Sequence, residues 1–439
     1  MKELLFNKDK ATFAIKNLKA FKHQAFAWSA SEEVVCYLDS NDYKEDKYSS
    51  VEGLLAVGKT SELLPNGNDS FKQLKKYYEE KKDWLFGFLT YDLKNEIEDL
   101  TSENFDGVDL PTLHFFQPKV VIEFQNNSVT IHSKEESAFD IFEKILNTEP
   151  FGTDDFFYGK KIRKEDVKAR ISKERYLETI ASIRDHIQKG DIYEMNFCQE
   201  FYVEDVDLNP YLLFEKFNEI GKAPFSAFYK LKDKFLLCAS PERFMAKEGQ
   251  KLISQPIKGT IKRGATYFED QKLKYQLYTS EKDRSENVMI VDLVRNDLAR
   301  SCKAGSVNVE ELFGIYPFEQ VHQMISTVVG ELEEEVHFID AIKNAYPMGS
   351  MTGAPKVRSM QLIEKYEATK RGLYSGAVGY IKPDGNFDFN VVIRSMIYNQ
   401  PEKYLSYQTG GAIVFDSKPE SEYAECLLKA KGMMKALGI

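Results

Sequence analysis

The pentapeptide Pro-Ile-Lys-Gly-Thr at residues 256–260 is the feature that most constrains this chain, because it predicts a rigid turn around Lys258. Pro256 fixes one backbone dihedral, and Gly259 allows close approach to a neighbouring segment. A lysine held in this way can act as a nucleophile where burial lowers its pKa and frees the amine. Most lysines are exposed to solvent, so the surroundings of Lys258 decide between these two interpretations.

Composition restricts the class of protein. At 439 residues, with 43% hydrophobic and 13% aromatic residues, the chain can build large cores in about two or three domains. A net charge of −10 without a long basic run argues against nucleic acid as a partner. The five cysteines are scattered, and no run of about 18 apolar residues occurs. We therefore expect a soluble, cytoplasmic protein without disulfides, a zinc site or a membrane span.

The chain divides into two unequal parts. Residues 1–160 predict an α+β subdomain with a surface helix over 71–82 and a hairpin over 120–132, and no pattern there is typical of a reaction. Residues 170–436 predict the domain that carries the chemistry. Its expected helices cover 173–189, 281–300, 340–345, 357–366 and 420–437, and its expected strands cover 235–239, 252–257, 376–382, 389–398 and 404–409.

Two of the predicted helices carry acidic faces. Asp283 and Glu286 are three residues apart on one, and Glu422, Glu425 and Lys429 follow a single stripe of the other. Each face alone is compatible with a solvated edge or an ordinary helix salt bridge. Carboxylates that converge from two helices would form the oxygen-only site that Mg²⁺ prefers.

Other features are suited to binding carboxylates. The Gly/Pro-rich segment 346–356 opens a predicted helix, whose free N–H groups attract anions, and Gly410 and Gly411 follow a predicted strand. Arg394 lies in an apolar run, where its guanidinium needs either a bound carboxylate or a structural salt bridge. Glu242, just after a predicted strand, would serve as an acid beside the Lys258 nucleophile.

Six segments of the second part occur in a characteristic order: S-P-E-R-F (240–244), P-I-K-G-T (256–260), D-R-S-E-N-V-M-I-V-D-L-V-R-N-D-L (283–298), G-S-M-T-G-A-P-K (349–356), S-G-A-V-G-Y (375–380) and Q-T-G-G-A-I-V through S-E-Y-A-E-C-L-L-K-A (408–430). Together they resemble the chorismate-utilising enzymes, which include anthranilate, aminodeoxychorismate, isochorismate and salicylate synthases. The resemblance covers residues 170–435. It implies an α+β fold in which large antiparallel sheets pack as a β-sandwich core with helices outside.

The residue at position 258 distinguishes members of this family. Aminodeoxychorismate synthases have lysine there, whereas anthranilate synthases typically have alanine. The resemblance implies that Lys258 attacks C2 of chorismate while Glu242 protonates the departing 4-hydroxyl. Ammonia then adds at C4 and expels the lysine, giving 4-amino-4-deoxychorismate for p-aminobenzoate and folate biosynthesis. A proton donor improves a poor leaving group, and a covalent amine splits one hard substitution into two easier ones.

The resemblance also implies roles for further residues. Glu286 and Glu425 match the ligands of a Mg²⁺ cofactor, with Asp283 and Glu422 in support. The groups that match substrate-binding and active-site positions are Tyr374, Arg394, Gly410, Gly411, Lys429 and His322.

Glu194 departs from the family pattern. Relatives that activate water carry lysine at this position, and amine-forming relatives usually carry glutamine. The missing lysine argues against water as the nucleophile, and the role of Glu194 stays open.

Three hypotheses compete. The first is aminodeoxychorismate synthase component I, which receives ammonia from a separate glutaminase (glutamine amidotransferase) subunit, since no glutaminase domain is expected in this chain. The alternative is anthranilate synthase component I, although its tryptophan-sensing Leu-Leu-Glu-Ser signature is absent from the first part. The third, an inactive regulatory relative, is disfavoured by the joint presence of Glu242, Lys258, Glu286 and Glu425.

Overall fold

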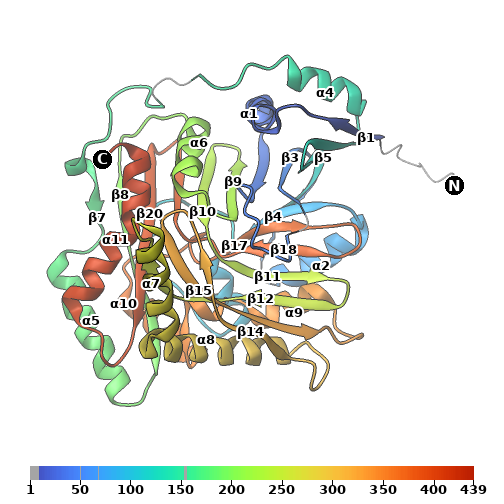
Figure 1. Ribbon diagram of the computed structural model, residues 1–439. Helices are drawn as coiled ribbons and strands as arrows, with labels where there is room; N and C mark the ends of the chain where they lie inside the picture. Colours follow the sequence, from blue (N-terminus) through green and yellow to red (C-terminus); the bar gives the residue numbers. More distant parts are fainter. Residues whose placement is uncertain (1–8, 50, 68, 153–155) are drawn as a thin grey trace.

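Antiparallel strands form the framework of the protein (Figure 1). The structure is a computed structural model that describes residues 9–49, 51–67, 69–152 and 156–439. Within these residues, twenty strands join one hydrogen-bonded network, and every pairing between named strands is antiparallel.

The α-helices of the described chain are α1 (Leu18–Trp28), α2 (Ser70–Lys81), α3 (Lys94–Ile97), α4 (Ala138–Leu146), α5 (Lys173–Gln188), α6 (Pro210–Gly221), α7 (Tyr267–Thr279), α8 (Glu281–Ala299), α9 (Phe338–Ala345), α10 (Lys356–Tyr366) and α11 (Pro419–Leu437). The strands are β1 (Asp9–Ala14), β2 (Val34–Asp39), β3 (Gly53–Leu63), β4 (Leu85–Leu89), β5 (Leu113–Gln125), β6 (Ser128–Ser133), β7 (Lys168–Ala169), β8 (Glu194–Val203), β9 (Phe225–Leu231), β10 (Lys234–Ser240), β11 (Arg243–Glu248), β12 (Lys251–Gln255), β13 (Ile257–Lys262), β14 (Asn308–Pro317), β15 (Val321–Glu331), β16 (Gly353–Ala354), β17 (Ala377–Ile381), β18 (Phe387–Asn390), β19 (Ser395–Asn399) and β20 (Tyr404–Ile413).

The strand order places the first part of the chain in the middle of the sheet. Hydrogen bonds lead from β8 through β20, β19, β10 and β9 to β2 and β3. They continue through β5, β4, β17, β18, β11 and β12 to β15. The division into residues 1–160 and 170–436 stays a prediction, and strand pairing crosses it at β2–β9 and β4–β17.

The strands form two layers with helices outside them. On β2, Val35 and Tyr37 belong to a core shared with α1, α4 and α6, whereas Val34 and Cys36 face a core built mainly from strands. Alternate side chains of a strand point to opposite faces, so the strand-built core lies between two sheet layers. Figure 1 shows α10 and α11 beside β8 and β20, and α8 beside β14 and β15. This arrangement confirms the predicted α+β sandwich.

Local sequence explains where the long outer helices begin and end. The Ser280 side chain caps α8 by accepting a hydrogen bond from the Asp283 N–H at 3.3 Å. Pro419 starts α11 at a position where its missing N–H costs nothing, and Gly438 ends it in the left-handed conformation. Both helices match the ranges predicted from the sequence to within one residue.

Three local predictions are wrong. Residues 256–260 do not form a turn: β13 starts at Ile257, and its pairing with β15 shifts register between Ile257 and Thr260. The single strand predicted over 389–398 is broken, because β18 ends at Asn390 and β19 starts at Ser395. Gly410 and Gly411 lie inside β20 and pair with β8 rather than following a strand.

All five cysteines are buried and free, in line with the expectation from their spacing. In the part of the chain that the structure describes, no helix is both long enough and apolar enough to cross a membrane.

Candidate active site

Two connections between the sheet layers lie side by side and carry Glu242 and Arg394. The chain passes from β10 to β11 at residues 241–242, and from β18 to β19 at residues 391–394. The Val391 N–H donates to the Glu242 carbonyl at 3.0 Å, and the Ala239 N–H donates to the Arg394 carbonyl at 3.0 Å. Arg394 takes a left-handed conformation with φ +50°, which breaks the strand. The break in the strand therefore lets the backbone of residues 391–394 run beside the connection that carries Glu242.

Lys258 is held on β13 by contacts to α8. Its side chain is 10% exposed, and its carbonyl accepts from Asn287 Nδ2 at 3.5 Å. Asn287 is fully buried and accepts from the Ser326 hydroxyl at 2.6 Å. Gly259 has φ +95°, and a Cβ there would lie 3.1 Å from Asp283, so glycine permits both the bulge and the close approach to α8.

Within the described residues, Glu194 forms an ion pair with Lys258. Its Oε1 lies 3.7 Å from the Lys258 Nζ, and its buried Oε2 has no hydrogen-bond partner in the described structure. Glu194 begins β8 and is 1% exposed. A Cβ on Gly353 would lie 2.3 Å from the Glu194 carbonyl, so the 349–356 segment packs directly on it. A buried carboxylate oxygen without a donor is costly and points to an absent polar partner.

Glu242 has the electrostatics of a proton donor. The residue is 4% exposed, and burial raises the pKa of its carboxyl to about 7. Hydrogen bonds from Ser350 and the Ile257 N–H, together with the charge of Lys258, act in the opposite direction. A carboxyl with this pKa still carries its proton in a large fraction of molecules near neutral pH.

Acidic side chains from α8 and α11 converge near the same lysines. Burial raises the pKa of Glu286, which Lys258 and Lys282 counteract. Burial alone would raise the pKa of Glu425, but Lys429 at 2.8 Å, with Lys282 and Lys258, lowers it. Both carboxylates thus lie within electrostatic range of Lys258 and Lys282, although they come from helices far apart in sequence.

The donor set fits magnesium. A Cβ on Gly411 would lie 3.4 Å from Glu425 Oε1 and 3.6 Å from Glu422 Oε2, so this glycine keeps space beside the carboxylates. In the described residues, no three His, Cys, Asp or Glu side chains are arranged to hold a metal by themselves. Mg²⁺ commonly takes only one or two protein carboxylates and completes its shell with water and substrate oxygens.

Arg394 is available for an anionic ligand. Among the described residues, no carboxylate forms an ion pair with its guanidinium, so the structural salt bridge considered from the sequence is absent. Burial lowers the pKa of Arg394, and Tyr374 and Glu425 oppose this shift. The Tyr374 hydroxyl lies 3.5 Å from the Cys198 Sγ, and Lys429 donates to the Gly410 carbonyl at 2.8 Å.

His322 has partners of its own. Its Nε2 lies 3.0 Å from Asp270 Oδ1 on α7, and its buried Nδ1 has no hydrogen-bond partner in the described structure. Arg263 also binds Asp270, at 2.8 Å. The structure therefore connects His322 to α7, and it records no hydrogen bond between His322 and Glu242 or Lys258.

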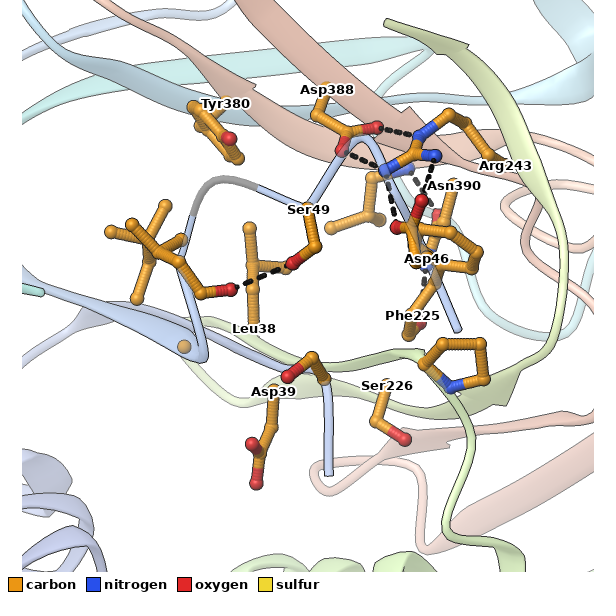
Figure 2. A pocket seen from close by; sticks show the side chains of 16 residues that line it. Leu38, Asp39, Asp46, Ser49, Phe225, Ser226, Arg243, Tyr380, Asp388 and Asn390 are labelled. Carbon is orange, nitrogen blue, oxygen red and sulfur yellow. Dashed lines mark hydrogen bonds and ion pairs between the residues drawn. The ribbon is translucent and has the colours of Figure 1, made fainter. Parts of the chain in front are cut away.

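Arg243, which the sequence analysis did not single out, connects Glu242 to the first part of the chain. Its guanidinium donates to Asp46 at 2.7 Å and to Asp388 at 2.9 Å, and it also binds Gln255. Figure 2 shows it at the edge of a pocket of about 60 Å³ that contains none of the predicted site residues. Its place in the segment S-P-E-R-F was the available signal, but its partners Asp46 and Asp388 are remote in sequence, so the pairing could not be predicted.

The chain is similar to known proteins over most of its length. A family model for chorismate binding enzymes matches residues 12–435. Aminodeoxychorismate synthase component 1 of Escherichia coli (strain K12) is 34% identical over 353 residues, which cover 80% of this chain and 76% of that protein. Anthranilate synthase component 1 of Acetivibrio thermocellus is 33% identical over 369 residues, which cover 80% and 74%.

Solved structures extend the similarity to the fold. The crystal structure of anthranilate synthase component I from Streptococcus pneumoniae TIGR4 superimposes with a TM-score of 0.76 at 26% identity, covering 89% of this chain and 93% of that one. The family match spans nearly the whole chain and includes residues 12–160, where the sequence resemblance was only general. The protein is a member of the chorismate binding enzyme family.

Proposed function

We propose that this enzyme converts chorismate and ammonia to 4-amino-4-deoxychorismate, the activity named for its relative in E. coli. The observation that carries the proposal is Lys258, a largely buried amine flanked by Glu194 and by the proton donor Glu242. A covalent route through lysine requires a largely buried amine of this kind beside a proton donor.

The first step requires a neutral amine. Lys258 gives up a proton, and Glu194, whose Oε1 lies 3.7 Å away, is placed to accept it. The Lys258 nitrogen then forms a bond to C2 of chorismate, both ring double bonds shift, and the C4–oxygen bond breaks. Glu242 donates its proton to that oxygen, which leaves as water.

The second step reverses the shift. Ammonia adds at C4, both ring double bonds return to their original positions, and the bond between C2 and the Lys258 nitrogen breaks. One proton leaves the incoming nitrogen, and one returns to the lysine, so the enzyme is restored. Glu194 and Glu242 are the buried carboxyl groups that can exchange these protons.

Carboxylate recognition falls to the surrounding groups. Arg394, free of ion pairs within the described chain, can bind a substrate carboxylate in bidentate geometry, with Tyr374 and Lys429 nearby. Glu286 and Glu425 would hold Mg²⁺, with Asp283 and Glu422 beside them. When bound, the ion would supply positive charge to a substrate carboxylate.

A partner supplies the ammonia in this proposal. The E. coli and Bacillus subtilis relatives are both named component 1, which implies a second component. We propose that this component is a glutaminase, and that the product enters p-aminobenzoate and folate biosynthesis.

Product analysis tests the proposal. Purified protein with chorismate, Mg²⁺ and an ammonium salt should form aminodeoxychorismate, detected as p-aminobenzoate after an aminodeoxychorismate lyase is added. Anthranilate fluorescence without lyase would instead identify an anthranilate synthase, the function named for relatives of similar identity. Absence of both products, with chorismate still bound, would support an inactive relative.

A further inference from the structure

A small cavity lies next to Glu242, between the sheet and the helices α8 and α9. Its volume is about 20 Å³, and every residue that lines it is buried. This is room for a single molecule the size of water. Glu242 and its hydrogen-bond partner Ser350 line the cavity, so it adjoins the reaction centre.

Asp297 lines the same cavity and has an unused acceptor. The residue is 3% exposed, and its Oδ2 accepts from the Lys356 ammonium at 2.6 Å. Its Oδ1 is buried and has no hydrogen-bond partner in the described structure. Buried carboxylate oxygens are normally satisfied, so this atom points to a small donor that occupies the cavity.

The rest of the lining narrows the identity of that donor. Most of the wall is apolar, and the apolar side chains are Phe244, Met245, Pro256, Val294, Leu298, Ala345, Met348 and Val391. An ion would lose its hydration there at high cost. Because Lys356 already balances the charge of Asp297, the cavity offers an acceptor without net charge. A small neutral molecule with N–H or O–H donors fits these conditions.

We infer that this cavity holds the ammonia molecule before it reaches C4 of the substrate, with one ammonia N–H donated to Asp297 Oδ1. The inference rests on the proposed function, which makes ammonia a substrate. No bond forms or breaks in the cavity. Ammonia leaves it past Glu242, which lines the cavity and lies within electrostatic range of Lys258.

Filling the cavity tests the inference. Ala345→Val adds two methyl groups to the lining, and Ala341→Val makes the same change on α9 at a buried residue that does not line the cavity. With chorismate saturating, Ala345→Val should raise the apparent KM for ammonium about tenfold or more. Its KM for chorismate should stay within about twofold of wild type, and Ala341→Val should leave both constants there.

Two further variants keep the test decisive if Ala345→Val fails to fold. Val294→Ile adds a single methyl group, and Asp297→Asn changes the acceptor, and each should raise the KM for ammonium more than the KM for chorismate. Circular dichroism and thermal melting confirm that each variant is folded. A folded variant of this set whose KM for ammonium equals that of wild type, or whose two KM values rise together, would overturn the inference.

The outcome is separable from that of the proposed function. Failure of wild-type protein to form aminodeoxychorismate from ammonium salts would contradict the proposed function itself. Formation of the product by wild type, with unchanged ammonium kinetics in the folded variants, would leave the function standing and identify the cavity as a site for structural water.

Discussion

At the level of single residues, burial sets the proton state of Glu242, and a carboxylate lies beside the Lys258 amine. A protonated lysine has no lone pair with which to attack, and an ionised carboxylate has no proton to donate. The structure places the Lys258 amine 3.7 Å from a carboxylate oxygen, and it holds Glu242 with a pKa of about 7. In the proposed reaction, Lys258 therefore has an acceptor nearby for its proton, and Glu242 retains a proton to donate.

Removal of the Lys258 amine should stop the reaction. We expect Lys258→Ala to lower aminodeoxychorismate formation by at least about 100-fold, because the covalent step is lost. Lys262→Ala removes an exposed lysine from the same strand and should leave the rate unchanged. Chromatographic product assays on the two folded variants make the comparison. Full activity of Lys258→Ala would refute the covalent route.

The pKa of Glu242 predicts the pH dependence of the rate. Glu242 must be protonated to donate, so its contribution to kcat/KM should fall as pH rises through about 7. Glu242→Gln should lower the rate by about 10²- to 10⁴-fold and remove this limb from the pH profile. A limb that persists in the variant would assign the titration to another group.

Stability should follow the same group. The folded pKa of Glu242 lies above its usual value of 4.5, so its protonated form adds stability that is fully present below about pH 4.5. This advantage is lost as pH rises toward 7, where the buried carboxyl must ionise. We therefore expect wild type to lose up to about 3 kcal/mol of unfolding free energy relative to Glu242→Gln between pH 4.5 and 8. Urea denaturation at several pH values measures the difference.

At the level of secondary-structure elements, two helices far apart in sequence form the acidic site. α8 contributes Glu286, and α11 contributes Glu425, and both lie within the electrostatic range of Lys258 and Lys282. On either helix alone, these residues look like an ordinary charged face. Gly411 adds no side chain beside Glu425 and Glu422, and with Glu286 these carboxylates are the candidate ligands of Mg²⁺.

Loss of one carboxylate should weaken the response to magnesium. We expect Glu425→Gln to raise the Mg²⁺ concentration for half-maximal activity by about tenfold or more, because one charged ligand is lost. Glu420→Gln, at an exposed position in the first turn of α11, is the matched control and should behave as wild type. Titration of activity with Mg²⁺ checks both. An equal requirement in the two variants would contradict the ligand assignment.

At the scale of the whole molecule, strands of the first part lie between two sets of later strands and pair with them at β2–β9 and β4–β17. Arg243 adds a buried link across this arrangement, because it joins Asp46 of the first part to Asp388 of β18. Its neighbour in sequence is Glu242, and its third partner, Gln255, stands just before the strand of Lys258. The link therefore fixes the segments that carry Glu242 and Lys258 relative to the first part of the chain.

Breaking this link should destabilise the fold. Arg243→Met leaves two partly buried carboxylates, Asp46 and Asp388, without their buried cation and should lower the unfolding free energy by about 3–5 kcal/mol. Arg295→Met breaks only an exposed ion pair and should cost less than about 1 kcal/mol. Adding Asp388→Asn to Arg243→Met should recover part of the loss. Equal urea midpoints for Arg243→Met and Arg295→Met would show that the link contributes little.

Several parts of this protein were predictable from local sequence. Helices such as α8 and α11 have clear periodicity and end signals, and their predicted ranges match. The segments around β13 and Arg394 were misread, because a bulge and a break in a strand depend on pairing with distant strands. Glycine at 259 signalled unusual backbone but did not reveal which partner required it.

The sequence by itself determined which reactive groups exist, in which order, and that they resemble one family of enzymes. Only the tertiary structure decided which of these groups lie next to one another. Glu194 and Gly411 come from one end of the strand order, and Glu242 and Lys258 come from the other. The physical reason is that apolar faces of both sheet layers must be buried against each other. This burial brings the Lys258 amine and the Glu242 carboxyl close to several carboxylates in one largely buried site, which is the arrangement that the proposed proton transfers require.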